Sequence, residues 1–173
     1  PGGLGAGAAW SATGEAAGDR YGASVAPAGD VNGDGYADVV AGAGRNTSDT
    51  GKAYLYLGGP GGLSTGAAWT AAGEAVGNWF GTSVAPAGDV NGDGHADVLV
   101  SAFGYANVTG QVYLYLGGPG GLSTGAARSA AGAVPGDRLG PSAATAAAVN
   151  GRGPALLAAV ACARPRAPGY SAL

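Results

Sequence analysis

The stretch GDVNGDGYADVV, residues 29–40, and its near-copy GDVNGDGHADVL, residues 88–99, decide the fold of this chain. Each stretch places an oxygen-bearing side chain at loop positions one, three and five, and a further aspartate at position nine. Three carboxylates in one short loop repel one another, and a hard cation that takes six to eight oxygen ligands relieves this repulsion. Position seven would contribute its main-chain carbonyl, so its side chain is free to vary.

The two stretches therefore predict two calcium sites. The predicted metal ligands are Asp30, Asn32, Asp34, Tyr36 (main-chain carbonyl) and Asp38 in the first loop, and Asp89, Asn91, Asp93, His95 (main-chain carbonyl) and Asp97 in the second. Solvated Asp-Gly turns without an ion are the alternative interpretation. The identical spacing in two copies favours the metal sites.

The loops differ from the helix-loop-helix calcium motif, which needs a bidentate glutamate at position twelve. Ala41 and Val100 occupy that position here. The residues after each loop, 39–41 and 98–100, form a short apolar run rich in β-branched valine, which favours a strand. We therefore expect a nine-residue loop that joins two strands.

A 59-residue repeat organises the whole chain of 173 residues. The string SVAPAGDVNGDG occurs at 24–35 and again at 83–94, and YLYLGGPGGLSTGAA occurs at 54–68 and 113–127. We expect repeat units at 1–59 and 60–118, and an incomplete third unit at 119–173.

Each unit reads as four short strands, at about residues 23–28, 38–43, 52–57 and 67–71 in the first copy, separated by GGPGG loops and by polar turns such as residues 45–50. The third strand is bulky and apolar on both faces, so both faces must be covered. Stacked four-stranded blades achieve this, and the period fits them. The predicted fold is all-β, a partial β-propeller of about three four-stranded blades whose third blade is degenerate and incomplete.

The third unit has lost the acidic pattern. Ala148, Arg152 and Leu156 stand where the loop aspartates stood, and only Asn150 remains. We expect this unit to bind no metal. The apolar and then basic tail, residues 155–168, is predicted to be a degenerate or poorly ordered blade edge.

Composition excludes several function classes. Six of the eleven acids lie in the two loops, which leaves five acids against eight scattered bases and gives no nucleic-acid surface. A single cysteine excludes an internal disulfide, and one histidine beside a predicted calcium loop argues against catalysis, so we expect no enzyme. No apolar run is long enough to span a membrane.

Short motifs of two or three residues that flank the loops carry a family resemblance. Tyr21-Gly22 and Phe80-Gly81 precede the loops, and Gly42-Ala43-Gly44 and Ser101-Ala102-Phe103 follow them. The chain resembles the FG-GAP repeat of the integrin α-subunit propeller and its bacterial relatives. The resemblance implies the same calcium ligands, a place in a seven-bladed ring, an extracellular or cell-surface location, and a role in adhesion or as an accessory domain of a secreted enzyme.

Three functional hypotheses follow. The leading one is a calcium-binding propeller segment that acts as an extracellular binding or adhesion module for a protein or glycan ligand. The alternatives are a non-catalytic accessory domain of a secreted hydrolase and a truncated product without function. Because three units are fewer than a ring needs, we expect further blades in a longer chain or self-association. Trp10 and Trp69 are expected in the core, and Glu15, Asp19 and Glu74 in surface turns.

Overall fold

The computed structural model describes residues 7–146 and 156–161. Its strands form two four-stranded antiparallel sheets, in the orders β1-β2-β3-β4 and β5-β6-β7-β8, and one two-stranded sheet of β9 and β10. The strands of the first sheet are β1 (Tyr21–Gly29), β2 (Asp38–Ala43), β3 (Lys52–Tyr56) and β4 (Trp69–Ala72). Those of the second are β5 (Phe80–Gly88), β6 (Asp97–Ala102), β7 (Gln111–Tyr115) and β8 (Arg128–Ala131), followed by β9 (Leu139–Ala146) and β10 (Leu156–Ala161).

This architecture confirms the predicted all-β fold of propeller-type blades. All four strands predicted in the first copy are present, with bounds that differ by no more than two residues. Each four-stranded sheet runs across a boundary between two of the sequence units, since β4 lies beyond residue 59 and β8 beyond residue 118. The division into units at 1–59, 60–118 and 119–173 stays a prediction.

Two single helical turns, α1 (Asn46–Asp49) and α2 (Tyr105–Val108), replace the plain polar turns expected between the second and third strands of each sheet. Their interiors hold non-glycine residues with positive φ, such as Thr47 at 51° and Asn107 at 58°. Such backbone conformations are uncommon outside glycine. Neither turn carries a glycine or proline pattern that would have predicted this geometry.

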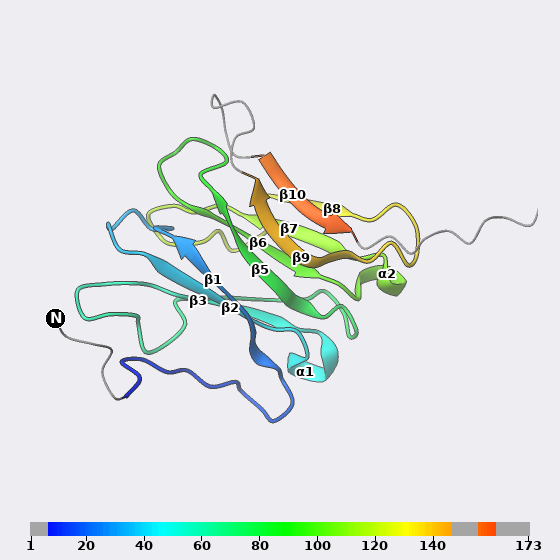
Figure 1. Cartoon of the computed structure of the whole chain (residues 1–173), viewed down its shortest axis with the longest axis horizontal. Helices are drawn as coiled ribbons and strands as arrows, with labels where there is room; N and C mark the ends of the chain where they lie inside the picture. Colours follow the sequence, from blue (N-terminus) through cyan, green and yellow to red (C-terminus); the bar gives the residue numbers. More distant parts are fainter. Residues whose placement is uncertain (1–6, 147–155, 162–173) are drawn as a thin grey trace, which may run out of the picture.

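The sheets pack face to face through their first strands. Strand β5 contacts β1, β2 and β3 of the first sheet, and β9 contacts β5, β6 and β7 of the second. Figure 1 shows β1, β5 and β9 side by side in this order. At one point the backbones touch, because a Cβ atom added to Gly42 would lie 2.0 Å from the carbonyl oxygen of Gly81. Only glycine permits this approach.

Tryptophan side chains link neighbouring elements through ring contacts and hydrogen bonds. Trp69 extends from β4 of the first sheet, packs edge-on against Tyr115 of the second with ring centroids 4.9 Å apart, and donates its indole N–H to the carbonyl of Ser123 at 3.0 Å. Trp10 makes the same pair of contacts with Tyr56 and Ser64. Trp69 is only 8% exposed, which confirms its predicted place in the core.

The third unit contributes β9 and β10, which pair antiparallel with Leu156 opposite Ala146. Three positions equivalent to loop ligands, Ala148, Asn150 and Arg152, and the tail from residue 162 onward lie outside the described residues. In the described part of the chain, no helix has the length and apolar character needed to cross a bilayer.

Strands β1 and β5 share the sequence SVAPAG but differ in burial. Val25 of β1 is 58% exposed, whereas the equivalent Val84 of β5 is 5% exposed. The difference arises because the first sheet covers one face of β5.

This pair provides a matched test of sheet-on-sheet packing. We expect Val84→Ala to lower the free energy of unfolding by about 2 kcal/mol, since it removes buried apolar surface. Val25→Ala should change it by less than about 0.5 kcal/mol. Urea denaturation of the two variants and the parent chain measures both values. Equal losses at the two positions would contradict the packing described here.

Candidate metal centre

The first acidic loop joins β1 to β2 and folds around the carboxylate of Asp30. One oxygen of Asp30 accepts the backbone N–H groups of Gly33 and Asp34 at 2.7 and 3.1 Å, and the other accepts that of Gly35 at 2.8 Å. Gly33 and Gly35 have φ values of 77° and 88°, which non-glycine residues rarely adopt. The glycines therefore permit the tight wrapping that the sequence predicted.

Within the same loop, the carboxylate of Asp34 accepts hydrogen bonds from two partners. The side-chain amide of Asn32 donates to one carboxylate oxygen at 2.9 Å, and the backbone N–H of Tyr36 donates to the other at 2.9 Å. The second loop, between β5 and β6, repeats the whole pattern with its own residues. Asp89 accepts from Gly92, Asp93 and Gly94, and Asp93 accepts from Asn91 and His95, at 2.7–3.1 Å.

The last aspartate of each loop is fully buried, at 0% exposure. Asp38 accepts the backbone N–H of Val31 at 2.8 Å with one oxygen and that of Gly58 at 2.8 Å with the other. Asp97 is held in the same way by Val90 and Gly117. This aspartate thus ties the start of the loop to the chain that leaves the third strand.

The carboxylates of one loop influence each other electrostatically. Burial raises the pKa of Asp38, two backbone N–H donors oppose this, and the charges of Asp34 and Asp30 raise it further. Asp97 shows the same raised pKa from burial, with added repulsion from Asp93 and Asp89. By contrast, backbone N–H groups lower the pKa of Asp30. Keeping each inner carboxylate ionised therefore costs free energy in the absence of a counter-charge.

The two loops also touch each other. Ala96 of the second loop donates its N–H to the carbonyl of Asp30 at 2.9 Å, and Gly118 donates to the carbonyl of Val31 at 2.9 Å. The ring of His95 lies against Gly33, where an added Cβ atom would be 2.7 Å from it. The sequence indicated that the side chain at position seven is free to vary, but His95 packs between the loops while Tyr36 is 41% exposed.

The donor types fit calcium, because every predicted ligand is a carboxylate, amide or carbonyl oxygen. Among the described residues, no group of three or more His, Cys, Asp and Glu side chains is gathered in an arrangement that could hold a metal ion. Coordination by these loops would therefore draw on the asparagine and main-chain oxygens as well as the carboxylates. The ten ligands stay a prediction.

Three other acids were expected in surface turns. Glu15 and Glu74 are exposed; Glu15 accepts from Lys52 at 2.6 Å and Glu74 from the hydroxyl of Tyr113 at 3.0 Å. Asp19 is instead 5% exposed and accepts from the backbone N–H of Ala16 and the amide of Asn46. The expectation was wrong for Asp19, because its partner Asn46 lies 27 residues away and gives no local signal.

Consecutive antiparallel sheets that pack through their first strands, with an acidic loop between the first two strands of each, define a β-propeller-type module. Residues 30–100 match the FG-GAP-like repeat family. The matched segment runs from the first residue of the first acidic loop to the strand after the second loop, so the resemblance to FG-GAP repeats is confirmed over this part of the chain. No curated protein matches the chain.

The buried aspartate provides a test that needs no metal. In excess EDTA, Asp38→Ala should lower the free energy of unfolding by about 2–4 kcal/mol, since it leaves the N–H groups of Val31 and Gly58 without an acceptor. Asp34→Ala, at an exposed position, should cost less than about 1 kcal/mol under the same conditions. Chemical denaturation gives both values, and similar losses for the two variants would argue against a structural role for Asp38.

Proposed function

We propose that this chain is a calcium-stabilised FG-GAP propeller segment that acts, without catalysis of its own, as an extracellular binding or adhesion module. One observation carries the calcium part of the proposal. Each loop holds a fully buried aspartate whose ionisation is opposed by burial and by two further carboxylates of the same loop.

A divalent cation would offset this charge. The residues that would hold it are the ten predicted ligands of the two loops. Bound calcium supplies positive charge and fixes the loop, and it takes part in no reaction here. The packing of the second loop on the first, through Ala96 and His95, supports a contribution of each ion to the relative position of the two sheets.

The binding role rests on the FG-GAP-like repeat, which is typical of extracellular proteins. Loops positioned by a rigid scaffold commonly carry recognition. A binding screen of glycans and matrix proteins, run with and without calcium, tests this part of the proposal; retention of a defined ligand supports it, and retention of none contradicts it.

Calcium should stabilise the fold by mass action. For dissociation constants of about 0.1–1 mM, 1 mM free calcium adds roughly 0.4–1.4 kcal/mol per site. With two sites, we expect the melting temperature to rise by about 2–10 °C relative to the protein in EDTA. Differential scanning calorimetry measures the shift.

The double variant Asp34→Asn, Asp93→Asn should lose most of this shift, because it removes one carboxylate from each loop. Asp49→Asn is the matched control, since the Asp49 side chain lies outside both loops and forms an exposed ion pair with Arg45 at 3.4 Å, and it should keep the shift. A melting temperature that is the same in calcium and in EDTA for the parent chain would rule out the calcium sites.

A further inference from the structure

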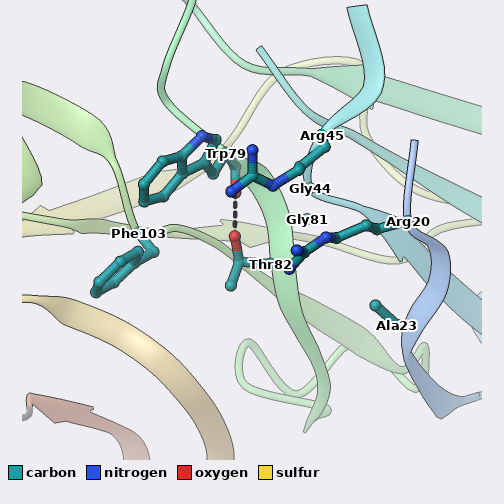
Figure 2. A pocket seen from close by; sticks show the side chains of 8 residues that line it. All are labelled: Arg20, Ala23, Gly44, Arg45, Trp79, Gly81, Thr82 and Phe103. Atoms are coloured by element: carbon teal, nitrogen blue, oxygen red, sulfur yellow. Dashed lines mark hydrogen bonds between the residues drawn. The ribbon is translucent and has the colours of Figure 1, made fainter. Parts of the chain in front are cut away.

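A pocket of about 230 Å³ opens between the first and second sheets. The pocket and the acidic loops lie at opposite ends of the strands. The pocket residues lie at the start of β1 and β5 and just after β2 and β6, whereas the loops connect the end of β1 to β2 and the end of β5 to β6. The pocket is lined by Arg20, Ala23, Gly44, Arg45, Trp79, Gly81, Thr82 and Phe103 (Figure 2). Pockets for drug-sized ligands usually measure about 300–1,000 Å³. This pocket is smaller and has room for one small ring.

The lining carries two cations and no acid. Figure 2 shows the guanidinium groups of Arg20 and Arg45 extending to the same side, that of Arg20 toward Thr82 and that of Arg45 toward Trp79. Arg45 has one exposed acidic neighbour, Asp49, at 3.4 Å. Within the described part of the chain, the guanidinium of Arg20 makes no hydrogen bond or ion pair. A guanidinium presents several N–H donors in a planar fork that matches a carboxylate.

Aromatic rings fix one wall of the pocket. Trp79 and Phe103 stack with centroids 5.5 Å apart and planes inclined by 16°, and the Arg45 guanidinium carbon lies 5.5 Å from the centre of the Trp79 ring. This cation–π contact holds Arg45 in place while leaving most of its N–H groups available. The walls of Gly44 and Gly81 add apolar C–H surface without side chains.

The backbone holds this arrangement in an unusual conformation. Arg20 and Trp79 occupy equivalent positions of the repeat, and both are left-handed, with φ values of 55° and 51°. A hydrogen bond from the Thr82 hydroxyl to the Trp79 carbonyl at 2.5 Å fixes the turn in the second copy (Figure 2). Arg138, at the same position of the third unit, has a φ of 56°, so this conformation belongs to the repeat; in the first two units it places Arg20 and Trp79 at the pocket.

The pocket residues also differ between repeats that are otherwise copies. Positions 59 residues after Arg45, Thr82 and Gly44 hold Gly104, Pro141 and Phe103. At the junction between the second sheet and β9, the counterparts of Arg20 and Arg45 are Trp79 and Gly104, and Arg138 takes the place that Trp79 has in the pocket. Of the two junctions that the structure describes, one therefore carries the paired cations, whereas a purely structural feature would recur with the repeat.

We propose that this pocket binds a carboxylate-bearing sugar residue, with the carboxylate between Arg20 and Arg45. The pocket admits one ring, the two guanidinium groups supply the charge, and the Thr82 hydroxyl and the apolar walls suit the hydroxyl and C–H groups of a sugar. The net charge of the chain is −3, so an anion is attracted here by this local pair of cations and not by the protein as a whole. The site gives the proposed binding role a ligand class and does not involve the metal loops.

The test is an NMR titration of the ¹⁵N-labelled chain with D-glucuronate, with neutral D-glucose as the comparison, in EDTA and in 1 mM calcium. We expect glucuronate to bind with a dissociation constant of about 1 mM, with shifts centred on residues 20, 45, 79 and 82, and glucose at least tenfold more weakly. Arg20→Gln and Arg45→Gln should each weaken glucuronate binding tenfold or more. Arg138→Gln, the matched change at the other junction, should leave it within twofold.

Several results would overturn the proposal. They are equal binding of glucose and glucuronate, shifts located elsewhere, and unchanged affinity in both arginine variants. Equal or tighter binding of N-acetylglutamate would assign the site to an acidic peptide instead of a sugar. The spectrum of each variant reports whether it is folded. If Arg20→Gln does not fold, Arg20→Lys takes its place and should weaken glucuronate binding by the same factor, because lysine lacks the planar fork of N–H donors. Binding that persists in EDTA while calcium fails to stabilise the chain would separate this site from the metal proposal.

Discussion

The close contact between β5 and the first sheet is the constraint on which the rest of the structure depends. Gly42 of β2 and Gly81 of β5 meet backbone to backbone, so the two sheets approach more closely than side chains would permit. At one end of this contact the acidic loops touch through Ala96 and Asp30, and at the other end the chain encloses a pocket. Both candidate sites are thus products of how one sheet lies on the next, although neither is part of the apolar core.

Burial in this fold is decided by position in the stack more than by local sequence. The shared string SVAPAG has an exposed Val25 in one copy and a buried Val84 in the other. Phe80 is 1% exposed, whereas Tyr21 at the equivalent position is half-buried and directs its hydroxyl to that of Tyr56 at 2.7 Å. The tyrosine hydroxyl can reach a hydrogen-bond partner at the partly exposed position 21, whereas phenylalanine has no polar group to satisfy at the buried position 80.

Much of the fold was predictable from the sequence because the same strand pattern occurs twice, 59 residues apart. The acidic loops were predictable for the same reason, since their spacing is short and local. Features that depend on distant partners were not predictable. The burial of Asp19 depends on Asn46, and the packing of His95 depends on Gly33 of the other loop. The left-handed backbone of Arg20 and Trp79 likewise has no sequence signature, because neither residue type indicates it.

Repetition and variation have separate roles in this chain. Residues that are copied from one repeat to the next, such as the loop aspartates and the tyrosines of β3 and β7, build the sheets and the turns between their strands. Residues that change between copies, among them Arg45 and Thr82, gather at the opposite strand ends, where two sheets meet. A scaffold that is fixed by its copied positions can accept substitutions there at little cost to the fold. The junction between the two four-stranded sheets is therefore the place where this repeat chain acquires a site that the other described junction, at β9, lacks.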